Sequence, residues 1–411
     1  MHSQHFKIGI IGGGAAGLMS AISAGESGCK NIALFEGNVR CGTKILMSGG
    51  TRCNVTNKSV TPKQFFGGNR NFIKNVLSAF NDQRTIQFFK SIGVELKLEP
   101  TGKYFPVDNE AKSVLNALIR KANEYNVQIF HSTKINDIKF DDNKFEIHSG
   151  DKKFYCNKVI LTTGGKSYPS TGSDGSGYGL AHKFSHSINP LFPALSPILL
   201  DEPIIKQLSG ITIPAALILF LNNKKEISFT DSLLFTHFGI SGPAVLNISR
   251  EVERLKNEKI KLALNVIPQY NSEEFRDEIK EQKQINPDRS IGNYLKQFVP
   301  ERLSNALIEI TGIDTGKKLK RISNSEMKTL IECFTNYNLK FFGVKGFSQA
   351  EATAGGIPLD EVKYQSLESR FQPGLFFAGE ILDVDGLLGG YNFQWAWSSG
   401  YVAGKAAASN N

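Results

Sequence analysis

The chain has 411 residues, which is enough for two or three domains, and 40% of them are hydrophobic, as is ordinary for a globular protein. No run approaches the roughly 20 apolar residues of a membrane span, and the polar start leads directly into an apolar strand, so neither a transmembrane helix nor a signal peptide is expected. The formal net charge of +9 favours a polyanionic ligand, which RNA and the phosphates of a dinucleotide satisfy equally well.

The first predicted element is a short, buried parallel strand, followed by a glycine-rich turn and an alanine-rich helix. Gly12, Gly14 and Gly17 have G-x-G-x-x-G spacing. In a dinucleotide-binding turn, the first glycine permits the tight bend, the second admits a pyrophosphate, and the third lets helix and strand pack closely. The backbone N–H groups where the helix begins, near Ala15 and Ala16, would then bind the phosphates.

The second strand covers residues 32–35 and ends at Glu36. An acid at this position accepts hydrogen bonds from the adenosine ribose hydroxyls. A lone glycine motif is weak evidence, but here a strand precedes it, a helix follows it, and an acid ends the next strand. We therefore predict dinucleotide binding. The alternative, a glycine-rich turn without a ligand, requires all of these features to coincide.

A polar, glycine-rich segment follows at residues 37–57, and ordered loops of this length beside a cofactor are usually functional. We expect donors from this loop to contact the pyrophosphate or the edge of a flavin ring. The candidate residues are Lys44, Ser48, Gly49, Arg52 and Asn54.

Three helices and four strands are predicted next, at residues 70–80, 81–92, 111–125, 127–130, 135–140, 144–148 and 153–163. Asp108 or Asn109 is expected to cap the third helix. The last strand runs into Gly164 and Gly165, which would bring a second backbone turn against the cofactor.

The pattern of predicted secondary structure changes near Leu191. Residues 193–268 contain mostly short strands, which suggests a small barrel or sandwich, and residues 269–340 are helical. The chain then returns to the first domain with a strand, two acids and a final helix. The residues expected at the cofactor in this part are Gly379, Glu380, Asp383, Gly390, Tyr391 and Asn392.

In a two-part flavin site, Glu380 or Asp383 would bind the ribitol hydroxyls. The N–H groups near Gly390 and Tyr391 would face the pyrimidine end of the flavin, where reduction builds negative charge.

The five cysteines form neither a C-x-x-C pair nor a cluster with metal-ligand spacing. This usage predicts a reducing, cytoplasmic environment and no metal site. It also argues against a dithiol reductase of the thioredoxin-reductase kind.

These motifs together resemble the bacterial HI0933-like family, whose members are described as NAD(P)/FAD-dependent oxidoreductases. The resemblance covers nearly the whole chain, and its most specific blocks are residues 48–54, 165–172, 235–243, 378–386 and 389–396. One departure is visible, because the family usually has a glycine where this chain has Thr51.

The resemblance implies an α/β fold with a two-part Rossmann-like FAD-binding domain at residues 1–192 and 341–411. A β-barrel-like domain at residues 193–268 and a small helical domain at residues 269–340 would interrupt it. FAD is the implied cofactor, and NADH or NADPH is the implied donor. No second complete glycine motif follows a strand, so a separate NAD(P)H domain is not expected.

Members of the family are linked to the reduction of carbon–carbon double bonds. One branch resembles a dihydrouridine synthase acting on large-subunit ribosomal RNA, and another resembles a bile-acid enone reductase. For RNA binding, aromatic residues interleaved with cations are expected, and one such patch is Phe65, Phe66, Arg70, Phe72 and Lys74, although it fits the start of an amphipathic helix as well.

In the reductase hypothesis, hydride passes to one carbon of the double bond, such as C6 of a uracil, and an acid protonates its neighbour. Cys53, His237 and Tyr168 are the candidate acids. Each has a simpler interpretation, since a lone cysteine is most often a small buried residue and a histidine in a turn often only hydrogen-bonds that turn.

Three functions remain open at this point. An RNA-modifying flavoenzyme would bind its substrate less tightly as salt rises. A small-molecule enone reductase would be insensitive to salt. A flavin-bearing binding protein without turnover would hold a reducible flavin that no acceptor reoxidises faster than oxygen does. No oligomeric state is predicted.

Overall fold

The computed structural model describes residues 4–202 and 207–409 of the chain. These residues form two compact units. The first comprises Met1–Phe192 and Ala350–Asn411, and the second comprises Pro193–Gln349. No helix in the described ranges combines the length and the apolar character needed to cross a bilayer.

A seven-stranded sheet organises the first unit, in the order β7-β2-β1-β10-β9-β8, with β20 also paired to β10. Its strands are β1 (Gln4–Ile11), β2 (Ile32–Phe35), β7 (Gln128–Phe130), β8 (Asp137–Asp141), β9 (Lys144–Ser149), β10 (Lys152–Leu161) and β20 (Leu375–Phe377). The pairs β2–β7, β1–β2, β1–β10 and β10–β20 are parallel, whereas β8, β9 and β10 form an antiparallel meander. All four residues of β2 are buried, as expected for a parallel strand covered on both faces.

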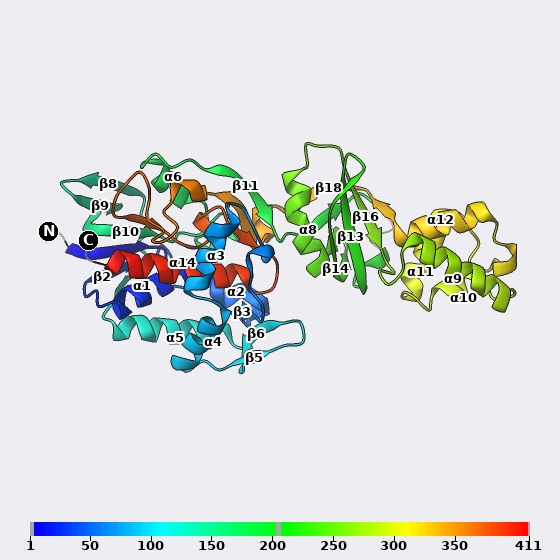
Figure 1. Ribbon diagram of the computed structural model, residues 1–411, viewed down its shortest axis with the longest axis horizontal. Coiled ribbons are helices and arrows are strands. Elements are labelled where there is room, and N and C mark those ends of the chain that lie inside the picture. The colour runs from blue at the N-terminus through cyan, green and yellow to red at the C-terminus, as the bar shows by residue number, and fades with distance from the viewer. Residues whose placement is uncertain (1–3, 203–206, 410–411) are drawn as a thin grey trace. The chain divides into compact units, whose positions relative to one another are not determined.

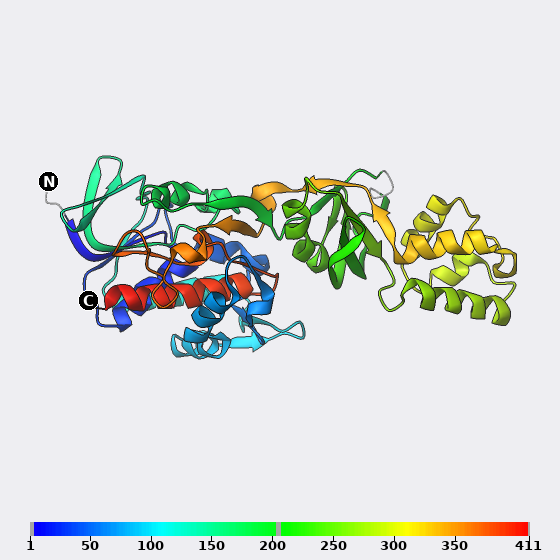
Figure 2. The ribbon, with the colours of Figure 1, turned by 45° about the horizontal axis from the view of Figure 1, so that its top comes forward.

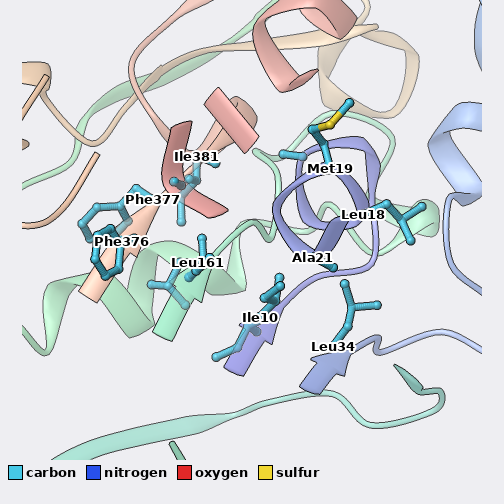
Figure 3. Close-up of a cluster of buried hydrophobic side chains, with 14 of the residues drawn as sticks. Ile10, Leu18, Met19, Ala21, Leu34, Leu161, Phe376, Phe377 and Ile381 are labelled. Carbon is cyan, nitrogen blue, oxygen red and sulfur yellow. The ribbon is translucent and has the colours of Figure 1, made fainter. Parts of the chain in front are cut away.

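Helices α1 (Ala15–Glu26) and α14 (Tyr391–Ala408) run side by side in both ribbon views (Figure 1, Figure 2). Their close approach depends on small residues. A Cβ on Gly400 would lie 2.5 Å from the Ala16 carbonyl oxygen, and one on Gly404 would lie 2.2 Å from that of Ser20. Side chains of α1, of the parallel strands and of the segment after β20 then gather in one apolar core (Figure 3).

Short elements surround this core. The helices are α2 (Thr43–Thr51), α3 (Arg70–Ala79), α4 (Asp82–Ser91), α5 (Ala111–Glu124) and α6 (Ser176–His182). The strands are β3 (Thr56–Asn57), β4 (Phe65–Phe66), β5 (Leu96–Leu98), β6 (Lys103–Pro106), β11 (Asn189–Ala194), β19 (Ala352–Gly356) and β21 (Asp385–Gly386). Four 3-10 turns complete the unit: η1 (Pro62–Gln64), η2 (Pro169–Thr171), η4 (Leu359–Glu361) and η5 (Gly379–Ile381).

The predicted cap of α5 is wrong. The residue before the helix is Glu110, and its side chain makes no capping hydrogen bond. Asp108 instead accepts hydrogen bonds from the Glu110 N–H and from the hydroxyl of Ser113 in the first turn, so it binds that turn through a side chain and not through its backbone N–H groups. Asn109 has a φ of +60° and turns the chain.

The second unit is built on another seven-stranded sheet, in the order β17-β16-β13-β14-β15-β12-β18. Its strands are β12 (Ile198–Leu200), β13 (Thr212–Leu221), β14 (Lys224–Thr236), β15 (Gly239–Ser241), β16 (Ile260–Asn265), β17 (Tyr337–Leu339) and β18 (Phe341–Val344), and all their pairings are antiparallel. The two edge strands, β17 and β18, are separated only by Lys340, so the sheet curls until its edges meet.

The helices of this unit are α8 (Pro243–Arg254), α9 (Ser272–Ile285), α10 (Ile291–Leu295), α11 (Glu301–Thr311), α12 (Asn324–Thr335) and α13 (Gly346–Gln349), with a 3-10 turn η3 (Leu319–Arg321). Figure 2 shows α9, α10, α11 and α12 grouped together. They share one hydrophobic core with the sheet, and their separation as a domain at residues 269–340 stays a prediction. Residues 341–349 were expected in the FAD-binding part, but they contain β18, which pairs with β12 inside the second unit.

Candidate cofactor-binding and active site

The turn between β1 and α1 has the geometry expected from its glycines. Gly12 has a φ of +107°, a conformation that favours glycine. A Cβ on Gly17 would lie 1.9 Å from the Gly12 carbonyl oxygen, so only glycine allows this approach of helix to strand. A Cβ on Gly14 would meet no protein atom within 4 Å, which leaves that face of the turn accessible to a ligand.

Helix α1 begins at Ala15 without a capping side chain and without an acid in its first turn. The N–H groups at the start of a helix have no partner within the helix and carry partial positive charge. This end of α1, beside Gly14 and Ala16, therefore has the chemistry of a phosphate site.

Glu36 lies directly after β2 and is buried, with 8% of its surface exposed. Its Oε2 accepts a hydrogen bond from the Gly13 N–H at 2.9 Å, and its Oε1 accepts one from the Asn38 N–H at 2.7 Å. Burial raises the pKa of Glu36, although these hydrogen bonds oppose the shift. Each oxygen keeps a lone pair that can accept a ribose hydroxyl.

A second polar cluster joins four residues that are far apart in the sequence. Lys44 Nζ lies 2.6 Å from Glu380 Oε2 and 2.5 Å from Ser167 Oγ. Glu380 Oε1 accepts hydrogen bonds from Ser167 Oγ at 2.6 Å and from the Thr353 N–H at 2.7 Å. Gly165 permits this arrangement, because a Cβ there would lie 2.5 Å from Thr353 Oγ1 and 2.9 Å from Glu380 Oε1.

The electrostatics of the cluster favour a charged pair. Burial acts to raise the pKa of Glu380, but the attraction of Lys44 and the hydrogen bonds to the carboxylate outweigh it, so the pKa is lowered. The side chains of Lys44 and Glu380 are 28% and 19% exposed, so both reach the surface of the site. They can therefore donate to and accept from a bound ligand.

The segment after α2 holds the start of α14. Asn57 Nδ2 donates to the Gly389 carbonyl at 2.9 Å. With the Asn54 amide oriented to satisfy both of its groups, its nitrogen donates to the Thr56 carbonyl and its oxygen accepts from the Gly390 N–H at 2.9 Å. The Gly390 N–H, predicted to face a flavin, therefore has a protein partner. The contact of the Tyr391 N–H with a flavin stays a prediction.

Helix α14 also fixes the segment after β20. The Trp395 indole donates to the Gly379 carbonyl at 3.1 Å, and the Gly379 N–H donates to Ser399 Oγ at 2.9 Å. A Cβ on Gly379 would lie 2.8 Å from Ala16 Cβ, so this segment also touches the start of α1. Since α14 meets α1 at Gly400, its first nine residues extend about 13 Å beyond that contact.

Several predicted cofactor ligands are engaged by protein groups. Ser48 Oγ donates to the Ile45 carbonyl at 2.8 Å. Arg52 pairs with Glu99 at 2.6 Å and stacks on the Phe105 ring at 3.9 Å. Their contacts with a cofactor stay predictions, as does that of Gly49, whose φ of +56° shapes the loop.

The remaining predicted residues also contact protein groups or shape the backbone, and their contacts with a cofactor stay predictions. The Asp383 carboxylate accepts a hydrogen bond from Asn189 Nδ2 at 2.7 Å. The Asn392 amide pairs with the backbone of Gly386 at 2.8 and 2.9 Å, which ties the first turn of α14 to β21. Gly164 has a φ of +75° and turns the chain toward the Lys44–Glu380 cluster.

The departure at Thr51 has a structural consequence. Gly49, Gly50 and Thr51 have φ values of +56°, +66° and +70°, so three successive residues are left-handed. The backbone path of a glycine is thus kept by a β-branched residue, for which this conformation is strained.

The three candidate acids lie in different environments. Cys53 is completely buried, and burial raises the pKa of its thiol to about 12. Tyr168 is half-buried and directly follows Ser167 of the polar cluster, and burial together with Glu351 raises the pKa of its phenol. His237 belongs to the second unit, where it is exposed in the turn between β14 and β15.

Sequence reasoning missed Ser167 and Thr353, which hold the Glu380 carboxylate, and Gln394, which accepts hydrogen bonds from Thr56 and Thr85 inside the core. Ser167 lies within residues 165–172, one of the segments that most resemble the family, and this was the only feature of the sequence that pointed to it. Within the described ranges, no group of three or more His, Cys, Asp or Glu residues is arranged to hold a metal ion.

These features fit FAD. The open face at Gly14, the remaining lone pairs of Glu36, and the partly exposed pair of Lys44 and Glu380 supply acceptors and donors for phosphate, ribose and ribitol. All of these residues belong to the first unit.

The chain is similar to known proteins over nearly its full length. The sequence profile of the HI0933-like protein Rossmann domain matches residues 6–406. A 3-dehydro-bile acid delta(4,6)-reductase of Clostridium scindens is 33% identical over 405 residues, which cover 98% of this chain and 99% of that protein. A ribosomal RNA dihydrouridine synthase of Escherichia coli is 32% identical over 405 residues, 98% of both chains.

Among solved structures, a 3-ketosteroid delta1-dehydrogenase of Sterolibacterium denitrificans superposes with a TM-score of 0.52 and 10% identity, covering 99% of this chain and 100% of that one. This likeness concerns the fold. The predicted α/β fold with a Rossmann-like part and the predicted family are confirmed. This chain therefore belongs to the HI0933-like family of flavin-dependent oxidoreductases.

Proposed function

We propose that this protein uses FAD and NAD(P)H to reduce a carbon–carbon double bond, and that its substrate is uridine in large-subunit ribosomal RNA, which becomes dihydrouridine. The observation that carries the reductase assignment is the set of nucleotide-binding features assembled in the first unit, around Gly14, Glu36 and the Lys44–Glu380 pair. The net charge of +9 and the full-length similarity to an RNA dihydrouridine synthase support RNA as the substrate.

In this proposal the glycine turn and the start of α1 bind the pyrophosphate, and Glu36 accepts the ribose hydroxyls. Glu380 accepts a ribitol hydroxyl while Lys44 keeps its carboxylate ionised. FAD supplies hydride-transfer chemistry once it is bound. The first turn of α14, from Tyr391, offers N–H groups where negative charge would develop.

Reduction of the double bond also needs one proton, delivered to the carbon beside the one that receives hydride. We infer that Tyr168 fits this role best among the groups of the first unit. Its raised pKa keeps the phenol protonated at neutral pH, and its half-buried position lets it reach a substrate. Complete burial opposes a direct role for Cys53, whereas the exposed His237 is the candidate of the second unit.

Three variants separate these candidates, namely Tyr168→Phe, His237→Gln and Cys53→Ala. In the variant that lacks the proton donor, NAD(P)H should still reduce the flavin, which is measured as a loss of flavin absorbance. The same variant should form no reduced product. A candidate whose variant still forms product at the normal rate is eliminated.

NAD(P)H has no Rossmann domain of its own in this proposal. The strand pairs among the described residues of the second unit are all antiparallel, which does not support a second βαβ dinucleotide site there. The nicotinamide would therefore bind transiently beside the flavin.

A small-molecule enone reductase is the second candidate, because the bile-acid reductase is as similar to this chain as the RNA synthase is. The two functions differ in their response to salt. A protein that neutralises RNA phosphates releases their counterions, so the affinity for RNA falls steeply as ionic strength rises. The affinity for an uncharged enone does not depend on ionic strength in this way.

The deciding experiment is nucleoside mass spectrometry of ribosomal RNA from cells with and without this gene. The proposal predicts that the uridine derivative with two extra hydrogens disappears from large-subunit RNA and returns when the intact gene is restored. Restoration of a Gly17→Ala gene, whose product should not hold FAD, should fail. An unchanged dihydrouridine content in the deletion strain would refute RNA modification and favour the enone reductase.

A further inference from the structure

The second unit carries a group of aromatic and basic side chains that its fold does not require. We call it the β18 surface and define it as His237, Phe238, Phe342 and Lys345. Phe342 is 67% exposed, the highest value of any Phe, Tyr or Trp among the described residues. A single exposed phenyl ring is common on protein surfaces, so its significance depends on the aromatic and basic residues near it in the sheet.

A β-bulge directs Phe342 outward. Leu199 and Leu200 are consecutive in β12, but their partners in β18 are Gly343 and Phe341, so Phe342 is the extra residue between them. Phe341 packs against the core of the unit, and Gly343 has a φ of +152°. Bulges commonly redirect a side chain at sheet edges and beside functional sites.

The neighbouring residues belong to the same part of the sheet. The Leu200 N–H donates to the Phe238 carbonyl at 3.2 Å, and the Lys345 N–H donates to the Pro197 carbonyl at 2.9 Å, so both residues flank β12. Lys345 Nζ lies 3.9 Å from the centre of the Phe238 ring. Within the described part of the chain, this ammonium makes no ion pair and can bind an additional anion.

His237 extends the surface, since its ring meets the Phe238 ring edge to face with centroids 5.0 Å apart. Phe238 directly precedes β15, Phe342 lies in β18 and Lys345 directly follows it, and β12 pairs with both β15 and β18. Paired strands are about 4.8 Å apart. Bases with exposed faces and charged phosphates alternate on this scale in single-stranded nucleic acid.

Protection of an edge strand does not account for this composition. A bulge or a lysine is enough to prevent edge-to-edge pairing, and an exposed phenyl ring works against it. The patch expected from the sequence around Phe65 and Phe72 is not a rival, because these two side chains are 4% and 7% exposed and pack in the core of the first unit.

We propose that the β18 surface binds a single-stranded segment of the RNA substrate, with an unpaired base stacked on Phe342 and a backbone phosphate bound by Lys345. The inference rests on the proposed function, in which RNA is the substrate, and it adds the residues of the second unit that hold this RNA. Stacking selects unpaired bases without reading their sequence, whereas the lysine contributes salt-dependent affinity.

The test measures the binding of fluorescein-labelled oligouridylate to the full-length, FAD-loaded protein by anisotropy over a range of salt concentrations. Phe342→Leu keeps an apolar side chain but removes the aromatic face, and it should weaken binding roughly 5- to 150-fold. Phe342→Trp should bind within about twofold of the unchanged protein. Lys345→Gln should reduce the slope of log K against log salt by about 0.7, the value for one phosphate on a single strand.

Tyr364→Leu is the matched control, because this side chain is 43% exposed but lies in the first unit. It should leave RNA binding unchanged. Flavin content and thermal unfolding of each variant verify that the fold is intact. If Phe342→Leu unfolds the protein, the tryptophan and glutamine variants still decide the outcome.

The two hypotheses fail in different ways. If the protein binds RNA and produces dihydrouridine, but Phe342→Leu and Lys345→Gln bind as tightly as the unchanged protein, the β18 surface is refuted and the proposed function stands. If the unchanged protein binds no RNA and reduces an enone, both are refuted.

Discussion

Replacing Thr51 by glycine should stabilise the protein. Thr51 has a φ of +70°, and a left-handed conformation costs a residue with a Cβ about 1–2 kcal/mol. Glycine removes this cost but adds freedom to the unfolded chain, which offsets about 0.4–1 kcal/mol. The Thr51 hydroxyl bonds only to the neighbouring Gly50 carbonyl, and the residue is exposed, so little else is lost. The net gain is about 0–1.6 kcal/mol, with a midpoint of about 0.8 kcal/mol.

The assay is urea unfolding of the FAD-loaded protein followed by circular dichroism. Thr51→Ala is the matched control, because it removes the β-branch and the hydroxyl but keeps the Cβ, and it should be less stable than Thr51→Gly. Thr329→Gly, in the interior of α12, should lower stability. This position has no left-handed strain to relieve, and glycine is unfavourable inside a helix. A Thr51→Gly protein that unfolds at a lower urea concentration than the unchanged protein would refute the strain at this position.

Further predictions concern the cofactor site. Gly17→Ala places a Cβ 1.9 Å from the Gly12 carbonyl oxygen and should disrupt the turn. At Gly14 a Cβ meets no protein atom within 4 Å, so Gly14→Val should leave circular dichroism unchanged. It should nevertheless abolish FAD retention, which is measured as flavin absorbance per polypeptide. Burial opposes ionisation of Glu380, but Lys44 lowers the pKa overall, so the pair stabilises the fold above the unfolded value of 4.5 and loses this effect as pH falls below it. Glu380→Gln should therefore flatten the pH dependence of the unfolding free energy below pH 4.5, and an unchanged slope would contradict the ion pair. A soluble aromatic disulfide should titrate one thiol of the native protein, Cys29, because the other four are buried.

The local part of the cofactor site was predictable from sequence. Gly12, Gly14, Gly17 and Glu36 lie within one strand–turn–helix–strand unit, whose geometry follows from backbone sterics and from short-range packing. The two asparagine hairpins at Asp142–Asn143 and at Asn222–Asn223 belong to the same class, because both residues of each turn have positive φ.

The long-range part was not predictable in detail. Lys44 and Glu380 are separated by 336 positions, and their contact depends on the packing of α14 against α1. The Asn54 amide bonds to Gly390, a contact between the loop after α2 and the start of α14 that no local pattern predicts, and its contact with the cofactor stays a prediction. The burial of Cys53 likewise depends on tertiary packing that no local pattern encodes.

Strands β11 and β19 form a two-stranded sheet at the points where the chain leaves and re-enters the first unit. A Cβ on Gly355 would lie 2.1 Å from the Pro190 carbonyl oxygen, so the two strands are in intimate contact there. The ends of the intervening segment, residues 193–349, are consequently held next to each other by the first unit itself. Such a segment is a modular insertion. We therefore expect that a short loop, or the corresponding segment of a relative, could replace it without altering the connectivity of the nucleotide-binding strands.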